Sequence, residues 1–145
     1  MMFYGGLPPT FKACVTVYNR VISYDSNGRS ITEWKRCVVN HCNFVVRQTS
    51  DKRDGIITYK TSAKCYIAVS DKYVYPGSFT KNSRGFTLKP GDIIVNGIVT
   101  DEIKDIKGFR ATDLAEKYKN RCLVIRDVSI NDKIPFGQHY LAVGI

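Results

Sequence analysis

The stretch that decides the fold is CVTVYNRVISYDSNGRSITEWKRCVV, residues 14–39. Its two ends, 14–24 and 31–39, are rich in Val, Ile, Tyr and Trp, which favour extended strands. The polar segment between them contains Asn27-Gly28, a pair that readily adopts the positive φ angles of a tight hairpin turn. We therefore predict a β-hairpin over these residues.

A second hairpin is predicted immediately downstream. The apolar segments 44–48 and 56–59 flank the polar stretch 51–55, which ends in glycine and suits a charged turn. Residues 64–69 then alternate with the period of two that is typical of a strand. Because both faces of this segment are fairly apolar, we expect it to lie centrally in a sheet.

A third tight hairpin is predicted in the second half of the chain. The short apolar runs 93–95 and 98–100 flank the dipeptide Asn96-Gly97. The loop before them, 70–88, shows no strand signal and is long for a compact domain. Loops of this length usually have a function.

One helix and two strands complete the expected elements. Asp113 can cap a short helix over 113–119, and Glu116 three residues later completes a capping box. The segments 122–130 and 139–143 are predicted to be the final strands and are expected to pair with each other.

These signals amount to about eight short strands and one short helix. Many short strands separated by turns predict a mainly β fold, a small antiparallel β-barrel or sandwich. A chain of 145 residues fits one domain. We place this domain at 13–145, after an extended N-terminal arm at 1–12.

Composition and charge argue against a membrane-spanning, a secreted or a disulfide-rich protein. No stretch approaches the roughly 18–20 apolar residues that span a bilayer, and the N-terminus lacks the pattern of a signal peptide. Five cysteines without a framework spacing indicate reduced thiols and not a disulfide scaffold. The formal net charge of +9, of which +6 lies in residues 1–72, favours a polyanionic partner or simply keeps the protein soluble.

Residues suited to catalysis or metal binding are few. Cys37, His41 and Cys42 offer three zinc ligands, but a structural zinc site needs a fourth and none stands out. His139 lies in a predicted strand with no nucleophile motif, and the acidic cluster at 101–105 fits a solvated loop better than acid–base chemistry. No glycine-rich phosphate-binding motif occurs. We therefore expect no enzymatic activity, no metal and no cofactor.

Basic and aromatic residues are interleaved along the chain, as in proteins that bind nucleic acid. Phosphates attract Lys and Arg, and unstacked bases stack on aromatic rings. The candidates for charge are Arg47, Lys52, Arg53 and Lys60, and those for stacking are Tyr66, Tyr73 and Tyr75. A solvated hairpin tip explains the basic pair at 52–53 more simply, and strand propensity explains the tyrosines equally well.

The chain resembles the head-closure proteins of tailed bacteriophages and prophages, a family also described as head–tail connector or minor capsid proteins. The resemblance rests on VTVYN (15–19), Trp34, LKPGDIIVNG (88–97) and the 128–143 segment that contains His139-Tyr140. It covers most of the chain by layout, but only these pieces by motif. The long aromatic loop and the 113–119 helix depart from the family pattern, which leaves the tier open among adaptor, closure ring and tail completion.

The resemblance implies a structural role in the virion neck, after assembly in the host cytoplasm. It implies a β-barrel subunit in a homo-oligomeric ring, with portal and adaptor proteins on one side and tail-completion proteins on the other. Double-stranded DNA would pass through the lumen of the ring. The family has no catalytic residues.

Two groups of residues are expected to make these contacts. The predicted partner interface consists of the loop aromatics Tyr73, Tyr75, Phe79 and Phe86. The predicted basic loop that faces DNA or the lumen consists of Arg47, Lys52 and Arg53. Two other functions stay open: an oligonucleotide-binding β-barrel that engages single strands, and a hydrolase or metal enzyme that uses Cys37, His41 or His139.

Overall fold

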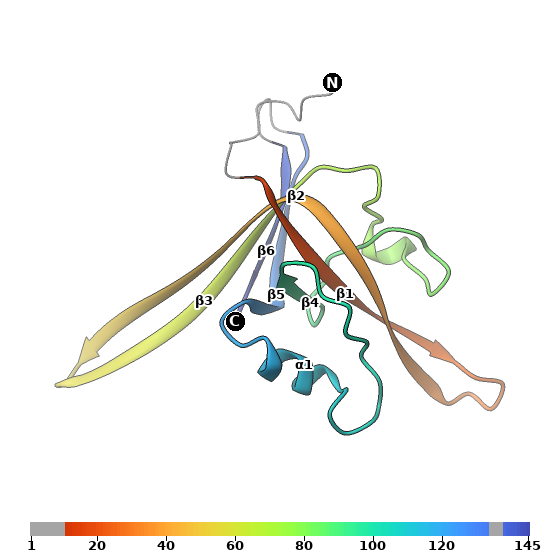
Figure 1. Ribbon diagram of the computed structural model, residues 1–145, viewed down its shortest axis with the longest axis horizontal. Coiled ribbons are helices and arrows are strands. Elements are labelled where there is room, and N and C mark those ends of the chain that lie inside the picture. The colour runs from red at the N-terminus through yellow and green to blue at the C-terminus, as the bar shows by residue number, and fades with distance from the viewer. Residues whose placement is uncertain (1–10, 134–137) are drawn as a thin grey trace.

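The computed structural model describes residues 11–133 and 138–145 and shows a closed antiparallel β-barrel with two projecting hairpins (Figure 1). The elements are β1 (Ala13–Tyr24), β2 (Ser30–Arg53), β3 (Ile56–Ala68), a 3-10 turn (Pro76–Ser78), β4 (Ile93–Asn96), α1 (Ala111–Lys117), β5 (Cys122–Asn131) and β6 (His139–Gly144). The strands follow each other around the barrel in the order β1-β2-β3-β6-β5-β4. The prediction of a mainly β, barrel-like fold with one short helix is confirmed.

The described residues form six strands instead of about eight, because several of the predicted strands merge. β2 is a single strand of 24 residues, and β3 joins the predicted segments 56–59 and 64–69. The residues between these two segments, Lys60-Thr61-Ser62-Ala63, contain no Gly or Pro that would interrupt an extended chain. The two hairpin turns at 25–28 and 54–55 form where they were predicted, and Gly28 and Gly55 have φ angles of 78° and 79°.

The predicted hairpin at Asn96-Gly97 does not form. After Gly97 the chain leaves the sheet, and β5 takes the place beside β4. The hydroxyl of Thr16 holds the departing segment, because it donates to the Gly97 carbonyl oxygen (2.8 Å) and accepts from the Val99 amide (3.1 Å). A side chain of β1 thus satisfies the backbone groups that a returning strand would have paired.

The barrel closes through the last two strands, which pair with each other as predicted. β6 also pairs with β3, and β5 with β4, so the sheet returns to β1. Gly144 permits this close approach, because a Cβ atom at that position would lie 1.9 Å from the Val124 carbonyl oxygen. We infer that a larger residue at position 144 would force β5 and β6 apart.

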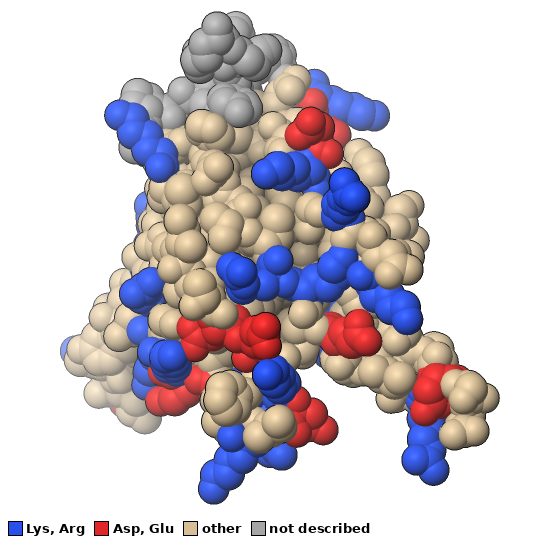
Figure 2. Space-filling model, turned by 45° about the vertical axis from the view of Figure 1, so that its right-hand side comes forward, with Lys and Arg blue, Asp and Glu red and all other residues tan. Residues whose placement is uncertain are grey.

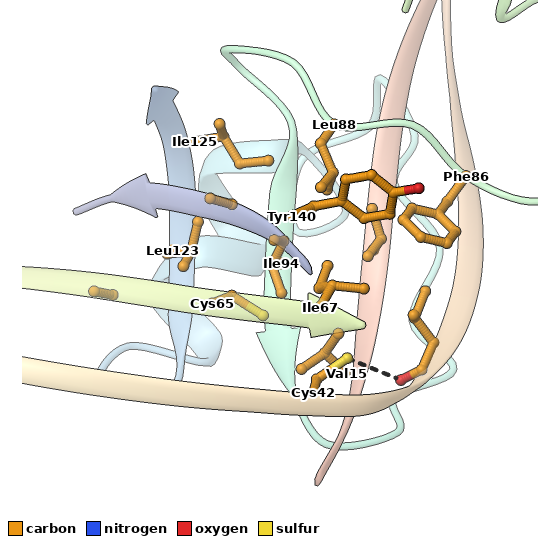
Figure 3. Close-up of a cluster of buried hydrophobic side chains, with 14 residues drawn as sticks. Val15, Cys42, Cys65, Ile67, Phe86, Leu88, Ile94, Leu123, Ile125 and Tyr140 are labelled. Atoms are coloured by element: carbon orange, nitrogen blue, oxygen red, sulfur yellow. Dashed lines mark hydrogen bonds between the residues drawn. The ribbon is translucent and has the colours of Figure 1, made fainter. Parts of the chain in front are cut away.

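The barrel interior is a continuous apolar core (Figure 3). Figure 3 shows side chains from the strands meeting the ring of Phe86 and the side chain of Leu88, which come from the loop 70–92. Phe86 and Leu88 are 0% and 1% exposed. The loop is therefore part of the core and covers the apolar interior that the strands leave open.

A second apolar cluster lies outside the barrel wall, on β1 and β4. Tyr18, Ile93 and Val95 pack there against Val99 and against Leu114 of α1. The helix begins at Ala111 and not at the predicted Asp113. Asp113 is the third helical residue, and its carboxylate accepts from the amides of Arg110 (3.0 Å) and Gly108 (2.9 Å). The predicted capping residue thus stabilises the helix start from inside the first turn.

The predicted N-terminal arm at 1–12 lies almost wholly outside the described residues. Within the described part, Phe11 is buried, and its ring lies 6.0 Å from Tyr66 and 6.4 Å from His139. No helix in the described ranges is long and apolar enough to cross a membrane.

A buried polar cluster ties the loop 70–92 to β1. Asp92 is 0% exposed and accepts from Asn19 Nδ2 (2.7 Å), from the Arg20 amide (3.0 Å) and from Lys89 Nζ (2.7 Å). Asn19 is also 0% exposed and exchanges hydrogen bonds with the backbone of Thr87 at 2.6 and 3.1 Å. Both oxygens of the carboxylate thus accept hydrogen bonds, as a buried charge requires.

Removing this carboxylate should be costly. Asp92→Ala leaves buried donors of Asn19 and Arg20 unpaired and should lower the free energy of unfolding by about 3 kcal/mol. Urea denaturation followed by circular dichroism measures the change. The control is Asp105→Ala, which removes a fully exposed carboxylate 3.5 Å from Arg110 and should leave stability unchanged within error. Equal losses in the two variants would contradict this account.

Candidate interaction site on a projecting hairpin

The β2–β3 hairpin extends far beyond the barrel. The pairing between β2 and β3 is in unbroken register from Cys42↔Ile67 to Arg53↔Ile56. β3 pairs with β6 only over Ala63–Ala68, and β2 pairs with β1 only up to Cys42. Residues 47–62 therefore form a two-stranded ribbon with no third strand from the described chain, and Figure 1 shows it pointing away from the other elements.

One face of this ribbon, called the apolar face below, bears exposed apolar side chains among the polar residues Gln48, Ser50, Lys52 and Thr61. Side chains alternate between the faces of a strand, so the face that bears buried Ala63 continues with Tyr59 and Ile57 on β3 and with Val46 on β2. Val46, Ile57 and Tyr59 are 42%, 55% and 65% exposed. A two-stranded hairpin is marginally stable in water, and its apolar face is stabilised only when something covers it.

The apolar face ends in a groove at the base of the ribbon. A cavity of about 210 Å³ lies between the hairpin, the end of α1 and the last strands. Its apolar lining comes from Val46, Ala63, Ala115, Cys122 and Ile145. Burial raises the pKa of the Cys122 thiol to about 11, so this thiol is protonated and weakly nucleophilic at neutral pH.

The opposite face, called the cationic face below, carries exposed Arg47 and Lys60 and continues onto the barrel with exposed Lys64. Nearer the tip this face also carries Asp51 and exposed Ile56. Of the predicted basic loop, Lys52 lies on the apolar face, and Arg53 pairs with Asp51 at 3.1 Å. The structure therefore places Arg47, Lys52 and Arg53 on one hairpin without bringing them onto one face.

The aromatic loop is folded against its own barrel. Phe86 is fully buried, and Tyr73 stacks on Tyr140 with ring centroids 4.1 Å apart. The expectation that all four loop aromatics face a partner is thus wrong for Phe86, because this ring closes the apolar core of its own chain. Tyr73 is partly buried against the same core.

The outer part of the loop keeps one exposed aromatic ring. Tyr75 is 57% exposed, and its hydroxyl donates to the Asp132 carboxylate at 3.4 Å. Phe79 is partly buried, with Lys35 Nζ 5.3 Å from its ring centroid. Lys35 also donates to the Ser83 carbonyl oxygen and so holds the loop against β2. Only Tyr75 among the four predicted aromatics presents most of its ring to solvent.

The residues considered for catalysis do not converge. No group of three or more His, Cys, Asp or Glu in the described residues is placed to hold a metal ion, Cys37, His41 and Cys42 included. His139 packs its ring against Tyr66 at 5.6 Å. Cys65 is buried beside Cys42, which raises the pKa of its thiol.

Each acidic residue of the 101–105 cluster has a cation of its own. Asp101 accepts from Lys117 Nζ (2.6 Å) and from the Tyr118 hydroxyl, and these hydrogen bonds lower the pKa of its carboxyl. Glu102 pairs with Lys104 at 3.3 Å, and Asp105 pairs with Arg110 at 3.5 Å. These exposed ion pairs hold the loop in place and do not form a matched acid and base.

Sequence reasoning missed the apolar face of the ribbon. The sequence predicts a strand over Ile57 and Tyr59, but a strand that is buried in a sheet has the same composition as one that projects. The only local sign is the position of Ile56-Ile57 directly after the turn glycine, where most hairpins are polar.

Comparison with known proteins finds one relationship. A family model described as a family of unknown function (DUF6751) matches residues 10–144, nearly the whole chain. No curated protein and no solved structure matches the sequence or the fold.

Shortening the ribbon should leave the barrel folded. Replacing residues 48–61 by Asn-Gly removes no core contact and should change the free energy of unfolding by less than about 1 kcal/mol. Phe86→Ala is the contrasting variant and should cost about 3–5 kcal/mol, because it empties a buried site. Thermal and urea unfolding measure both. Loss of cooperative unfolding in the shortened chain would show that the ribbon belongs to the core.

Proposed function

The chain belongs to the DUF6751 family of unknown function, and we propose that it is a structural subunit that assembles head to tail with copies of itself into a ring. The observation that carries this proposal is the ribbon at 47–62, a long extension with an uncovered apolar face. It is an assembly element and not a catalytic one.

The side of the molecule opposite the ribbon has a receiving surface. The β1–β2 hairpin and the β2–β3 hairpin diverge to opposite sides in Figure 1. A cavity of about 670 Å³ lies between the tip of the β1–β2 hairpin and the loop before α1, with Ile31, Trp34, Ile103 and Ala111 in its lining. The apolar face of one ribbon docks in this cavity of the next copy.

A contact between two different surfaces repeats from copy to copy. When the rotation between neighbours closes, such a contact produces a ring, and otherwise it produces a filament. The cavity combines apolar residues with the polar and charged residues Ser30, Thr32, Lys104, Asp105, Arg110 and Thr112, and the ribbon face likewise combines apolar with polar residues.

The ring serves as a head–tail connector of a tailed bacteriophage or prophage. The resemblance of the chain to head-closure proteins supports this part of the proposal. Its neighbours are then portal and adaptor proteins on one side and tail-completion proteins on the other, in the virion neck after assembly in the host cytoplasm. The net charge of +9 suits a channel through which double-stranded DNA passes.

The alternative of a single-strand-binding barrel has less support. Such a protein needs aromatic rings that are open to stack on bases. Tyr66 packs against Phe11 and His139, and Tyr73 stacks on Tyr140. Two of the three tyrosines considered for stacking are therefore engaged within the chain.

Single substitutions on the two surfaces should abolish assembly. Ile57→Glu charges the apolar face of the ribbon, and Ile31→Glu charges the receiving cavity. Each should convert wild-type oligomers into monomers in sedimentation velocity and in negative-stain images. If the isolated wild-type chain is monomeric, wild type and variants are compared again after mixing with the portal and tail-completion proteins that the flanking genes would encode. The matched control is Thr58→Glu, one residue along and on the other face of the ribbon, which should assemble.

Mixing the two defective variants tests the head-to-tail geometry. Ile57→Glu keeps an intact cavity and Ile31→Glu keeps an intact ribbon, so their mixture should form a dimer that cannot extend. Failure of the wild-type chain to assemble alone or with those neighbours would overturn the proposal, as would a mixture that stays monomeric.

A further inference from the structure

We propose that the cationic face of the β2–β3 ribbon binds the phosphate backbone of double-stranded DNA through Lys64, Arg47 and Lys60. The interaction is independent of sequence. The binding face is opposite the face proposed for assembly. A chain that has not assembled should therefore already bind DNA.

The three cations form a regular ladder. They occupy successive cross-strand pairs on one face, Val45↔Lys64, Arg47↔Ser62 and Thr49↔Lys60. Each step advances two residues along the hairpin, about 7 Å, and the cation alternates between the two strands. None of the three could be aligned from sequence, because Arg47 and Lys60 meet only through the register of the hairpin.

These side chains are open to a ligand. Arg47, Lys60 and Lys64 are all exposed. No ion pair among the described residues involves any of the three. The ladder ends at Asp51, and Arg53 engages that carboxylate at 3.1 Å. The charge of the ladder is therefore not neutralised from within the chain.

This hairpin carries a third of the net charge of the protein, and the loop segment 72–91 carries a further +4. Residues 45–64 contain five basic and two acidic residues, a net charge of +3 within a total of +9. Figure 2 shows Lys and Arg side chains over much of the visible surface, with Asp and Glu mainly in its lower half. Elsewhere the acidic residues offset many of the cations, as they do between residues 101 and 119, where five acidic and five basic residues cancel.

The neighbours of the ladder favour a duplex over a single strand. The other residues of these pairs and of the next pair are Val45, Thr49, Ser62, Asp51 and Thr58, and none carries an aromatic ring. Tyr66, in the pair beyond Lys64 on the same face, packs against Phe11 and His139. Single strands gain much of their affinity from stacking on open aromatic rings, and the ladder itself has none. Cations and hydroxyl groups are the side chains that contact phosphates and sugars of a duplex.

Fluorescence anisotropy with a labelled 30-base-pair duplex and the matching 30-nucleotide single strand tests the proposal between 50 and 300 mM NaCl. Lys60→Gln should weaken duplex binding several-fold at fixed salt. Lys52→Gln removes the same charge from the apolar face of the same hairpin and should change it less than twofold. The triple variant Arg47→Gln, Lys60→Gln, Lys64→Gln should lower the slope of log K against log salt by about 2–3, since each phosphate contact contributes about 0.9.

Equal losses for Lys60→Gln and Lys52→Gln would overturn the proposal, because only the net charge would then matter. Absence of duplex binding at 50 mM NaCl, or an unchanged salt slope in the triple variant, would also overturn it. Tighter binding of the single strand would refute the duplex assignment. Thermal unfolding of each variant shows that the fold is kept, and repeating the titration with Ile57→Glu separates DNA binding from assembly.

Discussion

The structure depends on one strand that serves two hairpins. β2 pairs with β1 up to Cys42 and with β3 from Cys42 onwards. The change of partner coincides with a shift in the β1–β2 register beside His41, whose φ angle is 60°. A positive φ at a non-glycine residue carries a conformational cost, which the surrounding ladder must stabilise. β1 and β3 lie on opposite edges of β2 and so do not pair with each other. The strands β6, β5 and β4 close the barrel between them.

The closed barrel needs a cover for its apolar interior, and the loop 70–92 supplies it. Phe86 and Leu88 are anchored by their own burial, while Asn19 bonds the backbone of Thr87 between them and Asp92 accepts from the Lys89 amide that follows them. The polar cluster is therefore structural, although a buried carboxylate with several donors has the appearance of a functional site. A rigid barrel with this cover is a stable base from which a two-stranded ribbon can project without support from other strands.

Local chemistry made part of the structure predictable. The turns at Asn27-Gly28 and Gly55 depend on residues that are adjacent in the chain, and so does the start of α1 near Asp113. The burial of the loop aromatics and the faces of the hairpin depend instead on contacts between residues far apart in the sequence. A composition rich in aromatics cannot separate buried Phe86 from exposed Tyr75. The basic residues 47, 52 and 53 are neighbours in sequence, but the pleat divides them, and the register brings Lys60 and Lys64 beside Arg47 instead.

The two faces of the ribbon make their two proposed contacts compatible. A strand shows alternate residues to opposite sides, so a contact on the Ile57 face leaves the Lys60 face free. Covering the apolar face would also rigidify the ribbon and fix the spacing of the cations, which lowers the conformational entropy lost on meeting a phosphate backbone. In a closed ring the ladders of all copies would act together, and weak contacts of three cations each would sum to an appreciable affinity. Assembly and DNA contact would then be coupled through one hairpin without any change in its fold.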